Sequence, residues 1–282
     1  MGIVISVINN KGGCGKTTTT VNLAVALSRL KAKVLVVDLD SQSNTTDCFK
    51  DSITGQIGKT MYDLLDPQGQ EPPNVEDCIY NTEYHQLYLL PNISDTAMHG
   101  PAFIRSGEHA LNLLKDRLRP HALNNYDYTI IDCPPNLEVF VISALNASDF
   151  VIVPCESGSK FSVQGLVKAK KFIDDIKLSY NPDLRFLRLL ITKADHRTQI
   201  CKSIVSAIHA AFPSSDVFET IIPANTDFQK AEAKNQSIFK FRIGAPGAAA
   251  YTDVAKELLK AVPPAALEKP KAKRQFLTNR RQ

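Results

Sequence analysis

Short hydrophobic runs rich in β-branched residues alternate along the chain with longer stretches whose apolar positions recur at helical spacing. The short runs predict buried strands and cover residues 3–8, 33–40, 87–91, 128–135, 149–156, 185–192 and 218–223. The helical stretches cover residues 17–30, 108–118, a segment from about 137, 162–178, 199–211 and 247–261. Strands that are apolar on both faces and separated by helices predict an α/β fold, in which a mainly parallel, twisted sheet carries helices on both faces.

Two parts of the chain depart from this alternation. Residues from about 47 to 85 are less periodic and contain glycine, proline and asparagine, so we expect a surface excursion there. Residues 262–282 hold six basic residues against one acid, whereas the whole chain has a formal net charge of only +4. We therefore predict a single domain over residues 1–261 and a basic, solvated tail over residues 262–282.

Composition argues against several classes of protein. The six cysteines are scattered without a CxxC pair or a histidine at metal-ligand spacing, which favours reduced thiols over a zinc site or a disulfide framework. No apolar run approaches the roughly 18 residues that cross a bilayer, and the first residues lead directly into a strand rather than a cleavable leader. We therefore expect a cytoplasmic protein.

The segment NNKGGCGKTTTT, residues 9–20, lies between the first predicted strand and the first predicted helix. A glycine-rich loop at this position brings backbone N–H groups onto a phosphate group, and the helix dipole adds positive potential. Lys16 is then placed to reach the β- and γ-phosphates, and the Thr17 hydroxyl to ligate Mg²⁺. The close approach of the backbone is permitted by three glycines, Gly12, Gly13 and Gly15.

This loop departs from the common phosphate-binding pattern in two ways. Asn10 occupies the position of the first glycine in GxxxxGK[ST], and Lys11 adds a second lysine, so the motif is KGGxGKT. A phosphate-binding loop normally needs one lysine. Lys11 therefore requires a role of its own.

Two other predicted strands end in carboxylates. The segment VVDLD carries Asp38 and Asp40 two positions apart, and YTIID ends in Asp132. Carboxylates so placed can hold a metal ion through bound water and position an attacking water, although Asp38 and Asp40 could also be loop acids that cap a turn. Asp132 has the layout of a Walker B acid. The predicted metal site consists of Thr17, Asp38 and Asp132.

The segments KGGCGKT, DLDSQ and DCPP resemble, in this order, the motifs of the ParA/MinD family of deviant Walker A P-loop ATPases, most of all its short ParA branch. The resemblance extends from residue 3 to about 261. It implies a P-loop fold, ATP and Mg²⁺ as cofactors, slow hydrolysis of ATP to ADP and phosphate, and an ATP-dependent homodimer. Ser41 stands where the family usually has proline, which puts the rigidity of that loop in doubt.

The resemblance also assigns roles to individual residues. Lys16 would serve the nucleotide of its own subunit, Lys11 would reach the phosphates held by the partner subunit, and Asp40 would orient the attacking water. In the segment IIPANTDFQKAEA, Pro223 and Asn225 would line the adenine, although Asn225 could equally cap a helix. The implied nucleotide contacts are Lys11, Gly12, Gly13, Cys14, Gly15, Lys16, Thr17, Thr18, Pro223 and Asn225.

The same resemblance also implies a function. No second cluster of catalytic side chains is visible that would indicate a metabolic reaction, and no arginine finger is obvious that would speed hydrolysis. ParA-type proteins dimerise on ATP, bind DNA non-specifically and are released when a ParB-like or cargo adaptor protein stimulates hydrolysis. They segregate or position plasmid, chromosome or protein cargo on the nucleoid. Hydrolysis then functions as a timer, and the identity of the cargo is encoded in another protein.

Non-specific DNA binding requires cations that face phosphates. In the body these would be Lys230, Lys234, Lys240 and Arg242, which lie where ParA proteins carry a basic surface. In the tail they would be Lys271, Lys273 and Arg274. An ordinary charged face and a solvated tail explain the same residues equally well.

Three alternatives remain. A MinD-like protein would bind membranes through a terminal amphipathic helix, but the tail offers only Phe276 and Leu277 as apolar anchors, so no membrane is expected. An iron–sulfur ATPase would need cluster cysteines in glycine-rich settings, whereas Cys14 lies in the loop and Cys133 follows the Walker B acid. An ATP-dependent metabolic synthetase would need a substrate site that the sequence does not reveal.

Overall fold

A seven-stranded sheet forms the centre of the computed structural model, which describes residues 1–66, 72–158 and 162–265. The strand order is β3-β4-β2-β5-β1-β6-β7. All neighbouring strands run parallel except β3 and β4, which are antiparallel. The strands are β1 (Ile3–Val7), β2 (Val34–Asp38), β3 (Tyr80–Asn81), β4 (Leu87–Leu90), β5 (Tyr128–Asp132), β6 (Phe150–Glu156) and β7 (Arg185–Thr192).

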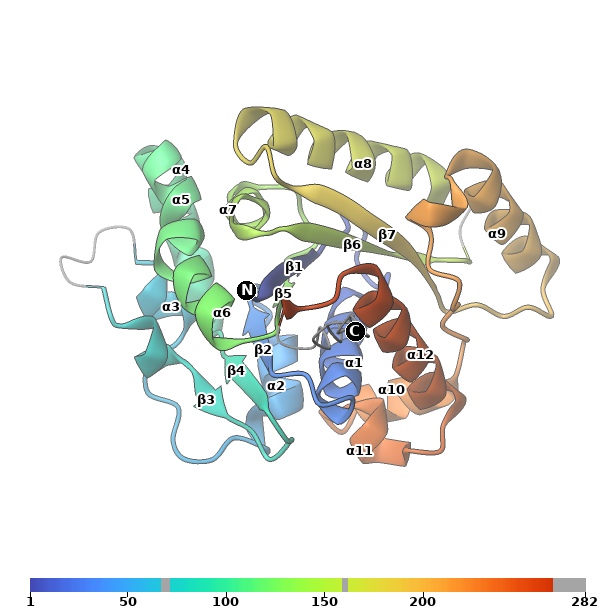
Figure 1. Ribbon diagram of the computed structural model, residues 1–282, viewed down its shortest axis with the longest axis horizontal. Coiled ribbons are helices and arrows are strands. Elements are labelled where there is room, and N and C mark those ends of the chain that lie inside the picture. Colours follow the sequence, from blue (N-terminus) through green and yellow to red (C-terminus); the bar gives the residue numbers. More distant parts are fainter. Residues whose placement is uncertain (67–71, 159–161, 266–282) are drawn as a thin grey trace, which may run out of the picture.

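Helices cover both faces of this sheet (Figure 1). One layer contains α1 (Lys16–Arg29), α2 (Asn44–Lys50), α10 (Thr226–Glu232), α11 (Ile238–Arg242) and α12 (Pro246–Ala261). The other contains α3 (Met61–Leu64), α4 (Gly100–Ser106), α5 (Glu108–Arg117), α6 (Arg119–Asn125), α7 (Val139–Ala147), α8 (Ser162–Ser179) and α9 (Gln199–Ala211). Three short 3₁₀ turns complete the described elements: η1 (Val75–Cys78), η2 (Ser94–His99) and η3 (Ser214–Asp216).

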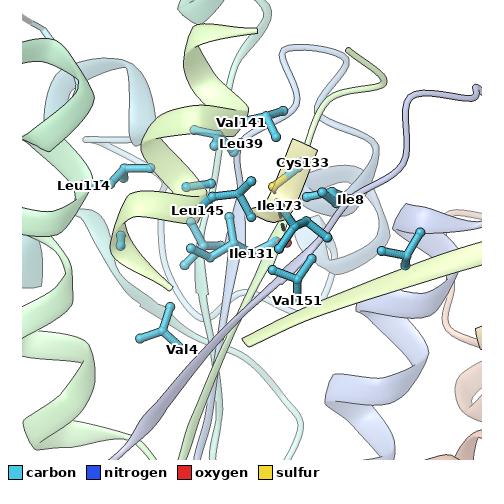
Figure 2. Close-up of a cluster of buried hydrophobic side chains, with 14 of the residues drawn as sticks. Val4, Ile8, Leu39, Leu114, Ile131, Cys133, Val141, Leu145, Val151 and Ile173 are labelled. Atoms are coloured by element: carbon cyan, nitrogen blue, oxygen red, sulfur yellow. Dashed lines mark hydrogen bonds between the residues drawn. The ribbon is translucent and has the colours of Figure 1, made fainter. Parts of the chain in front are cut away.

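The alternation of side chains along each strand creates two hydrophobic cores. Val4 belongs to the core under α5, α7 and α8, whereas its neighbour Ile5 belongs to the core under α1 and α12. Figure 2 shows the first core, where Ile131 and Val151 lie near Leu145. Burial of each such side chain contributes about 1.5–3 kcal/mol to the free energy of unfolding. The α/β fold expected from the sequence is thereby confirmed.

Residues 218–223 differ from the expected strand. The structure contains a single isolated bridge there, which joins Ala194 to Pro223. The reason lies in side-chain hydrogen bonds, because the backbone N–H groups of Glu219 and Thr220 donate to the Glu257 carboxylate at 2.9 and 2.8 Å. Phe218 and Ile222 donate to the Leu189 and Ile191 carbonyls of β7, but the two residues between them that bond to α12 interrupt a continuous strand ladder.

The region expected as a surface excursion, residues 47–85, is in part a component of the fold. It supplies most of α2, all of α3 and the edge strand β3. Phe49, Met61 and Leu64 are fully buried. Single apolar side chains anchor these short elements, and such isolated positions leave no helical or alternating period in the sequence.

The end of the described chain is fastened to the sheet. Helix α12 ends at Ala261, and the Tyr128 hydroxyl donates to the Val262 carbonyl at 2.6 Å. Tyr128 is the first residue of β5, so this contact lies at the amino edge of the sheet. The tail residues Lys271, Lys273 and Arg274 lie outside the described residues. Among the helices that are described, none is long and apolar enough to span a bilayer.

Candidate nucleotide-binding site

The carboxyl ends of the parallel strands meet at one edge of the sheet, and the loops that follow them carry the predicted site residues. A cavity of about 640 Å³ opens between these loops and α10. Its lining includes the loop after β1, Asp40 after β2 and Thr192 at the end of β7, and on the far side Pro223 and Asn225. The fold thus brings residues from distant parts of the sequence to one cavity large enough for a nucleotide.

The glycine-rich loop after β1 is held in a conformation that only glycine adopts easily. Gly13 has φ 74° and Gly15 has φ 94°, both in the left-handed region. Strand β7 supports the loop from behind, since the Thr192 hydroxyl donates to the Cys14 carbonyl at 2.9 Å and the Lys193 ammonium donates to the Gly13 carbonyl at 2.6 Å. The loop is therefore preorganised as a cradle for an anion.

Lys16 begins α1 and lines the cavity, with its ammonium 3.5 Å from the Lys11 carbonyl. Only 7% of Lys16 is exposed. Thr17 and Thr18 line the cavity beside it, at the positive end of the α1 dipole. The Cys14 side chain does not face the cavity and is buried instead, which raises the pKa of its thiol.

Lys11, the second lysine of the loop, does not line the cavity. The Lys11 ammonium forms an ion pair with the Glu156 carboxylate at the end of β6, at 3.0 Å. The Asn9 side chain accepts from the Lys11 N–H at 3.0 Å and donates to the Pro154 carbonyl at 2.7 Å. Both the backbone and the side chain of Lys11 are thus held by β6, and 44% of its side chain is exposed.

Asp132, at the end of β5, lies beneath the cavity and is completely buried. Its Oδ2 accepts hydrogen bonds from the Thr17 hydroxyl at 2.8 Å and from the Thr45 hydroxyl at 2.7 Å. Its Oδ1 accepts from the Thr20 hydroxyl at 3.3 Å. Three threonines therefore compensate for the desolvation of one carboxylate.

Asp38 lies directly beside Asp132, because β2 and β5 pair in parallel with these two residues in register. The Asp38 Oδ2 accepts from the Thr46 N–H at 2.8 Å and from the Thr46 hydroxyl at 2.7 Å. Burial, and next the charge of Asp132, raise the pKa of Asp38 well above its ordinary value. Burial raises the pKa of Asp132 too, while the hydroxyls of Thr45 and Thr17 oppose this rise.

Two adjacent buried carboxylates with raised pKa values suit a site that receives a cation, because a divalent ion stabilises their ionised forms. In the described chain, no group of three or more His, Cys, Asp or Glu side chains is arranged to hold a metal alone. Mg²⁺ commonly takes one or two carboxylates from the protein and completes its shell with phosphate and water. Thr17, Asp38 and Asp132 lie together as the sequence predicts.

Asp40 follows the end of β2 and lies at the wall of the cavity, with 7% of the residue exposed. Its Oδ1 accepts from the Gln42 N–H at 3.0 Å, and its N–H donates to Asp38 Oδ1 at 3.2 Å. These bonds hold the carboxylate at the turn before α2. Asp40 lines the same cavity as Lys16 and Thr17.

Pro223 and Asn225 line the opposite end of the cavity. The Asn225 side chain also caps α10, since its oxygen accepts from the Asp227 N–H at 2.8 Å. Both interpretations of Asn225 are therefore compatible with its position. Phe228 and Tyr251, which the sequence analysis did not single out, lie beside them with ring centroids 5.9 Å apart.

The four basic residues of the body lie near one another on α10 and α11 and the turn between them, and all are exposed. Two of them are paired within the chain. Lys240 contacts Glu83 at 2.6 Å, and Arg242 contacts Asp227 at 3.2 Å. Lys234 lies over the ring of Phe241 at 5.5 Å. This surface is consequently close to charge balance, and Lys230 and Lys234 are its most available cations.

Several residues of the site were missed by sequence reasoning. Thr20, Thr45 and Thr46 hold the buried carboxylates, while Glu156 and Lys193 hold the glycine-rich loop. The run SNTT after DLDSQ was a usable signal for the threonines, because hydroxyls near two strand-end acids are natural donors. Glu156 and Lys193 gave no comparable signal. All six cysteines are free thiols, as expected from their spacing.

Comparisons with known proteins found relatives that match most of the chain. Residues 2–186 match the family described as AAA domain. The chain is 32% identical to the chromosome partitioning protein ParA of Myxococcus xanthus, over 92% of this chain and 89% of the relative. It is 31% identical to the sporulation initiation inhibitor protein Soj of Bacillus subtilis, over 92% and 98%.

A solved structure is similar over nearly the whole chain. It is cobyrinic acid a,c-diamide synthase from Mycobacterium smegmatis with bound ADP and magnesium, which is 28% identical. The TM-score is 0.74, with 92% of this chain and 95% of that chain covered.

Proposed function

We propose that this chain, which belongs to the ParA/MinD family of P-loop ATPases, is a switch that dimerises on ATP, associates with DNA and is released after hydrolysis. The single observation that carries the proposal is the different placement of its two loop lysines. Lys16 faces the cavity of its own chain, whereas Lys11 lies outside it and half exposed. A cation in that position is available to a nucleotide held by a second subunit.

Within one subunit, the glycine-rich loop would bind the phosphates of ATP through its backbone N–H groups, and Lys16 would reach the β- and γ-phosphates. Thr17, Asp38 and Asp132 would hold Mg²⁺, which neutralises phosphate charge when bound. Pro223 and Asn225 would lie against the adenine. Bound ADP and magnesium in the 28% identical synthase support the choice of nucleotide and metal.

Asp40 would orient the attacking water, because it lies at the cavity wall beside the predicted phosphate end. A carboxylate in this place positions the water. The negative charge on the transferred phosphoryl group is stabilised by cations instead. Lys16 is the cation that the chain itself supplies there, and Lys11 of a second subunit would add another. Turnover by the monomer should consequently be slow.

The names of the relatives support a role in partition, since the 32% identical protein is a chromosome partitioning protein. We propose that the ATP-bound dimer binds non-specific DNA on the nucleoid and that a cargo-bound adaptor protein stimulates hydrolysis. Lys230 and Lys234 on α10 and beside it would contact phosphates, together with the basic residues of the tail. Dimerisation doubles these contacts, which makes retention on DNA depend on ATP.

A co-sedimentation experiment tests this proposal against its alternatives. The protein is mixed with plasmid DNA or with anionic liposomes, each with Mg²⁺-ATP and with Mg²⁺-ADP. We expect the DNA pellet to retain the protein in ATP several-fold better than in ADP, because two subunits share the contacts. Asp40→Ala should remain on DNA in ATP for longer than the parent protein, since hydrolysis is needed for release.

Other outcomes would point to other classes. Liposome binding without DNA binding would favour a membrane-associated, MinD-like protein. A chain that stays monomeric in ATP and binds neither would favour a metabolic synthase of the kind found among the structural neighbours. Rapid hydrolysis by Asp40→Ala would remove the proposed role of that carboxylate.

A further inference from the structure

Lys193, directly after β7, is a third lysine at the glycine-rich loop. Its ammonium donates to the Gly13 carbonyl at 2.6 Å, across 180 positions of the sequence. Unlike Lys11, it lines the nucleotide cavity. No carboxylate of the described chain forms an ion pair with it. Its positive charge is therefore not neutralised by the described part of the protein.

The backbone of Lys193 adopts a conformation that is unfavourable for a lysine. Its φ is 53°, in the left-handed region. The residues on either side contact different ends of the cavity. The Thr192 hydroxyl donates to the Cys14 carbonyl at 2.9 Å, whereas Ala194 forms the isolated bridge with Pro223. The left-handed turn at Lys193 thus connects the support of the glycine-rich loop with the opposite wall of the cavity, and strain of this kind is concentrated at functional sites.

Two successive carbonyls of the loop are held from the end of β7. Lys193 binds the Gly13 carbonyl, and Thr192 binds the Cys14 carbonyl. Both peptide bonds are trans, so the C=O and N–H of each peptide point in opposite directions. The N–H groups of Cys14 and Gly15 consequently point away from these two side chains. Among the residues that the structure describes, the Gly15 N–H has no acceptor, and Gly15 lines the cavity.

This support gains importance when a nucleotide is bound. In the structure, the Lys16 ammonium lies 3.5 Å from the Lys11 carbonyl, so it also contacts the loop backbone. In the proposed function Lys16 reaches the phosphates and gives up that contact. Within the described ranges, Lys193 and Thr192 are then the side chains that continue to bind carbonyls of the loop.

We propose that Lys193 is a positioning residue of the phosphate site, an inference that rests on the nucleotide site of the proposed function. Its ammonium stays on the Gly13 carbonyl and thereby directs the N–H groups of the loop at the β-phosphate. Its charge adds to the positive potential at the start of α1. Lys193 acts within one subunit, so its effect does not require the dimer, in contrast to the role proposed for Lys11.

Binding of a fluorescent ADP analogue with Mg²⁺ tests the inference on the full chain, because the proposed dimer forms only on ATP. Lys193→Met removes the ammonium, and Lys193→Arg keeps the charge. Lys202→Met is the matched control, since Lys202 is exposed on α9 and does not line the cavity. We expect Lys193→Met to weaken ADP binding about five- to tenfold, which corresponds to about 1–1.4 kcal/mol. Lys193→Arg should recover most of the affinity, and Lys202→Met should bind like the parent protein.

Competition against the fluorescent analogue by inorganic pyrophosphate and by AMP locates the effect. Pyrophosphate lacks the base, and AMP lacks the β-phosphate. We expect Lys193→Met to weaken pyrophosphate binding by about the same factor as ADP binding and to leave AMP binding unchanged. A residue that only stabilised the fold would lower the midpoint of urea unfolding without changing any of these affinities.

The outcomes separate this inference from the proposed function. A parent protein that does not bind ADP with Mg²⁺ would overturn both, whereas a parent that binds ADP but does not associate with DNA in ATP would overturn the proposed switch alone. Unchanged ADP binding by Lys193→Met, or an equal loss for AMP, would overturn the role of Lys193 alone. Should Lys193→Met fail to fold, Lys193→Gly takes its place, because glycine accepts the left-handed backbone and also lacks the ammonium.

Discussion

At the scale of single residues, the ion pair of Lys11 with Glu156 bears on the proposed dimerisation. Their ion pair is 3.0 Å long and both side chains are partly exposed. Pairs of this kind are worth about 0–1 kcal/mol, so a triphosphate carried by a second subunit can readily replace the Glu156 carboxylate. The pair would thus compete weakly with the proposed dimer.

This gives a prediction for two matched variants. Lys11→Ala should bind ATP but remain monomeric, because the cation that reaches the second nucleotide is missing. Glu156→Gln removes the competing charge and should lower the protein concentration needed for ATP-dependent dimerisation about two- to fivefold, as expected for up to about 1 kcal/mol. Size-exclusion chromatography with light scattering, at several protein concentrations in ATP and in ADP, measures both.

One result for each variant would contradict this prediction. A stable ATP-dependent dimer of Lys11→Ala would show that the side chain does not act across the interface. Weaker dimerisation of Glu156→Gln would show that Glu156 positions Lys11 for the partner instead of withholding it.

The lysines could be predicted from the sequence because their motif is local, whereas the partner of Lys11 could not. Glu156 lies 145 positions away, and an acid at the end of an apolar strand has many possible roles. The same limit applies to Lys193, whose bond to Gly13 spans 180 positions. Asp38, Asp40 and Asp132 were found because each ends a recognisable strand.

At the scale of elements, the turn between β2 and α2 is the least relaxed connection of the site. Ser43 is left-handed, and its buried hydroxyl lacks a partner among the residues described. A left-handed backbone costs about 1–2 kcal/mol for residues other than glycine. Helix α2, which starts from this turn, is held by its contacts to Asp38, Asp132 and the core.

Two substitutions of Ser43 distinguish the cost of its left-handed backbone from the cost of its buried hydroxyl. Ser43→Gly removes both the backbone strain and the hydroxyl, and should raise the free energy of unfolding by about 1 kcal/mol. Ser43→Ala removes only the hydroxyl and should raise it less. Urea unfolding followed by circular dichroism measures the difference, and equal stability of the two variants would mean that the left-handed backbone is not strained.

Element prediction succeeded where an element is long and apolar and failed where side chains satisfy the backbone. Strands β1, β2, β5, β6 and β7 were evident because their residues are nearly all hydrophobic. In the segment 218–223, the N–H groups of Glu219 and Thr220 donate to the Glu257 carboxylate, a contact that no periodicity reveals. Helix α2 was missed because it is short and carries a single fully buried aromatic residue, Phe49.

At the scale of the whole molecule, charge rather than shape distinguishes the possible DNA-binding surfaces. The exposed face of α10 and α11 contains Glu232 as well as the paired Lys240 and Arg242. The net attraction of that face for phosphate is therefore modest. The tail carries six basic residues against one acid and is the larger reservoir of positive charge.

The salt dependence of DNA binding should reveal which surface acts. Each lost phosphate contact lowers the slope of log affinity against log salt by about one. We expect the combined change of Lys271, Lys273 and Arg274 to alanine to lower the slope in ATP more than the combined change of Lys230 and Lys234. Fluorescence anisotropy with labelled duplex DNA measures both slopes, and the opposite order would assign DNA binding to the body.

The hydrogen bond between Tyr128 and Val262 holds the chain after α12 at a distance from the nucleotide cavity. Tyr128 begins β5 and Asp132 ends it. The bond to the Val262 carbonyl therefore lies at the amino edge of the sheet, opposite the edge where the cavity opens. A fluorescent reporter attached close to Val262 would therefore start at the edge of the sheet opposite the cavity, where it should not obstruct the entry of a nucleotide.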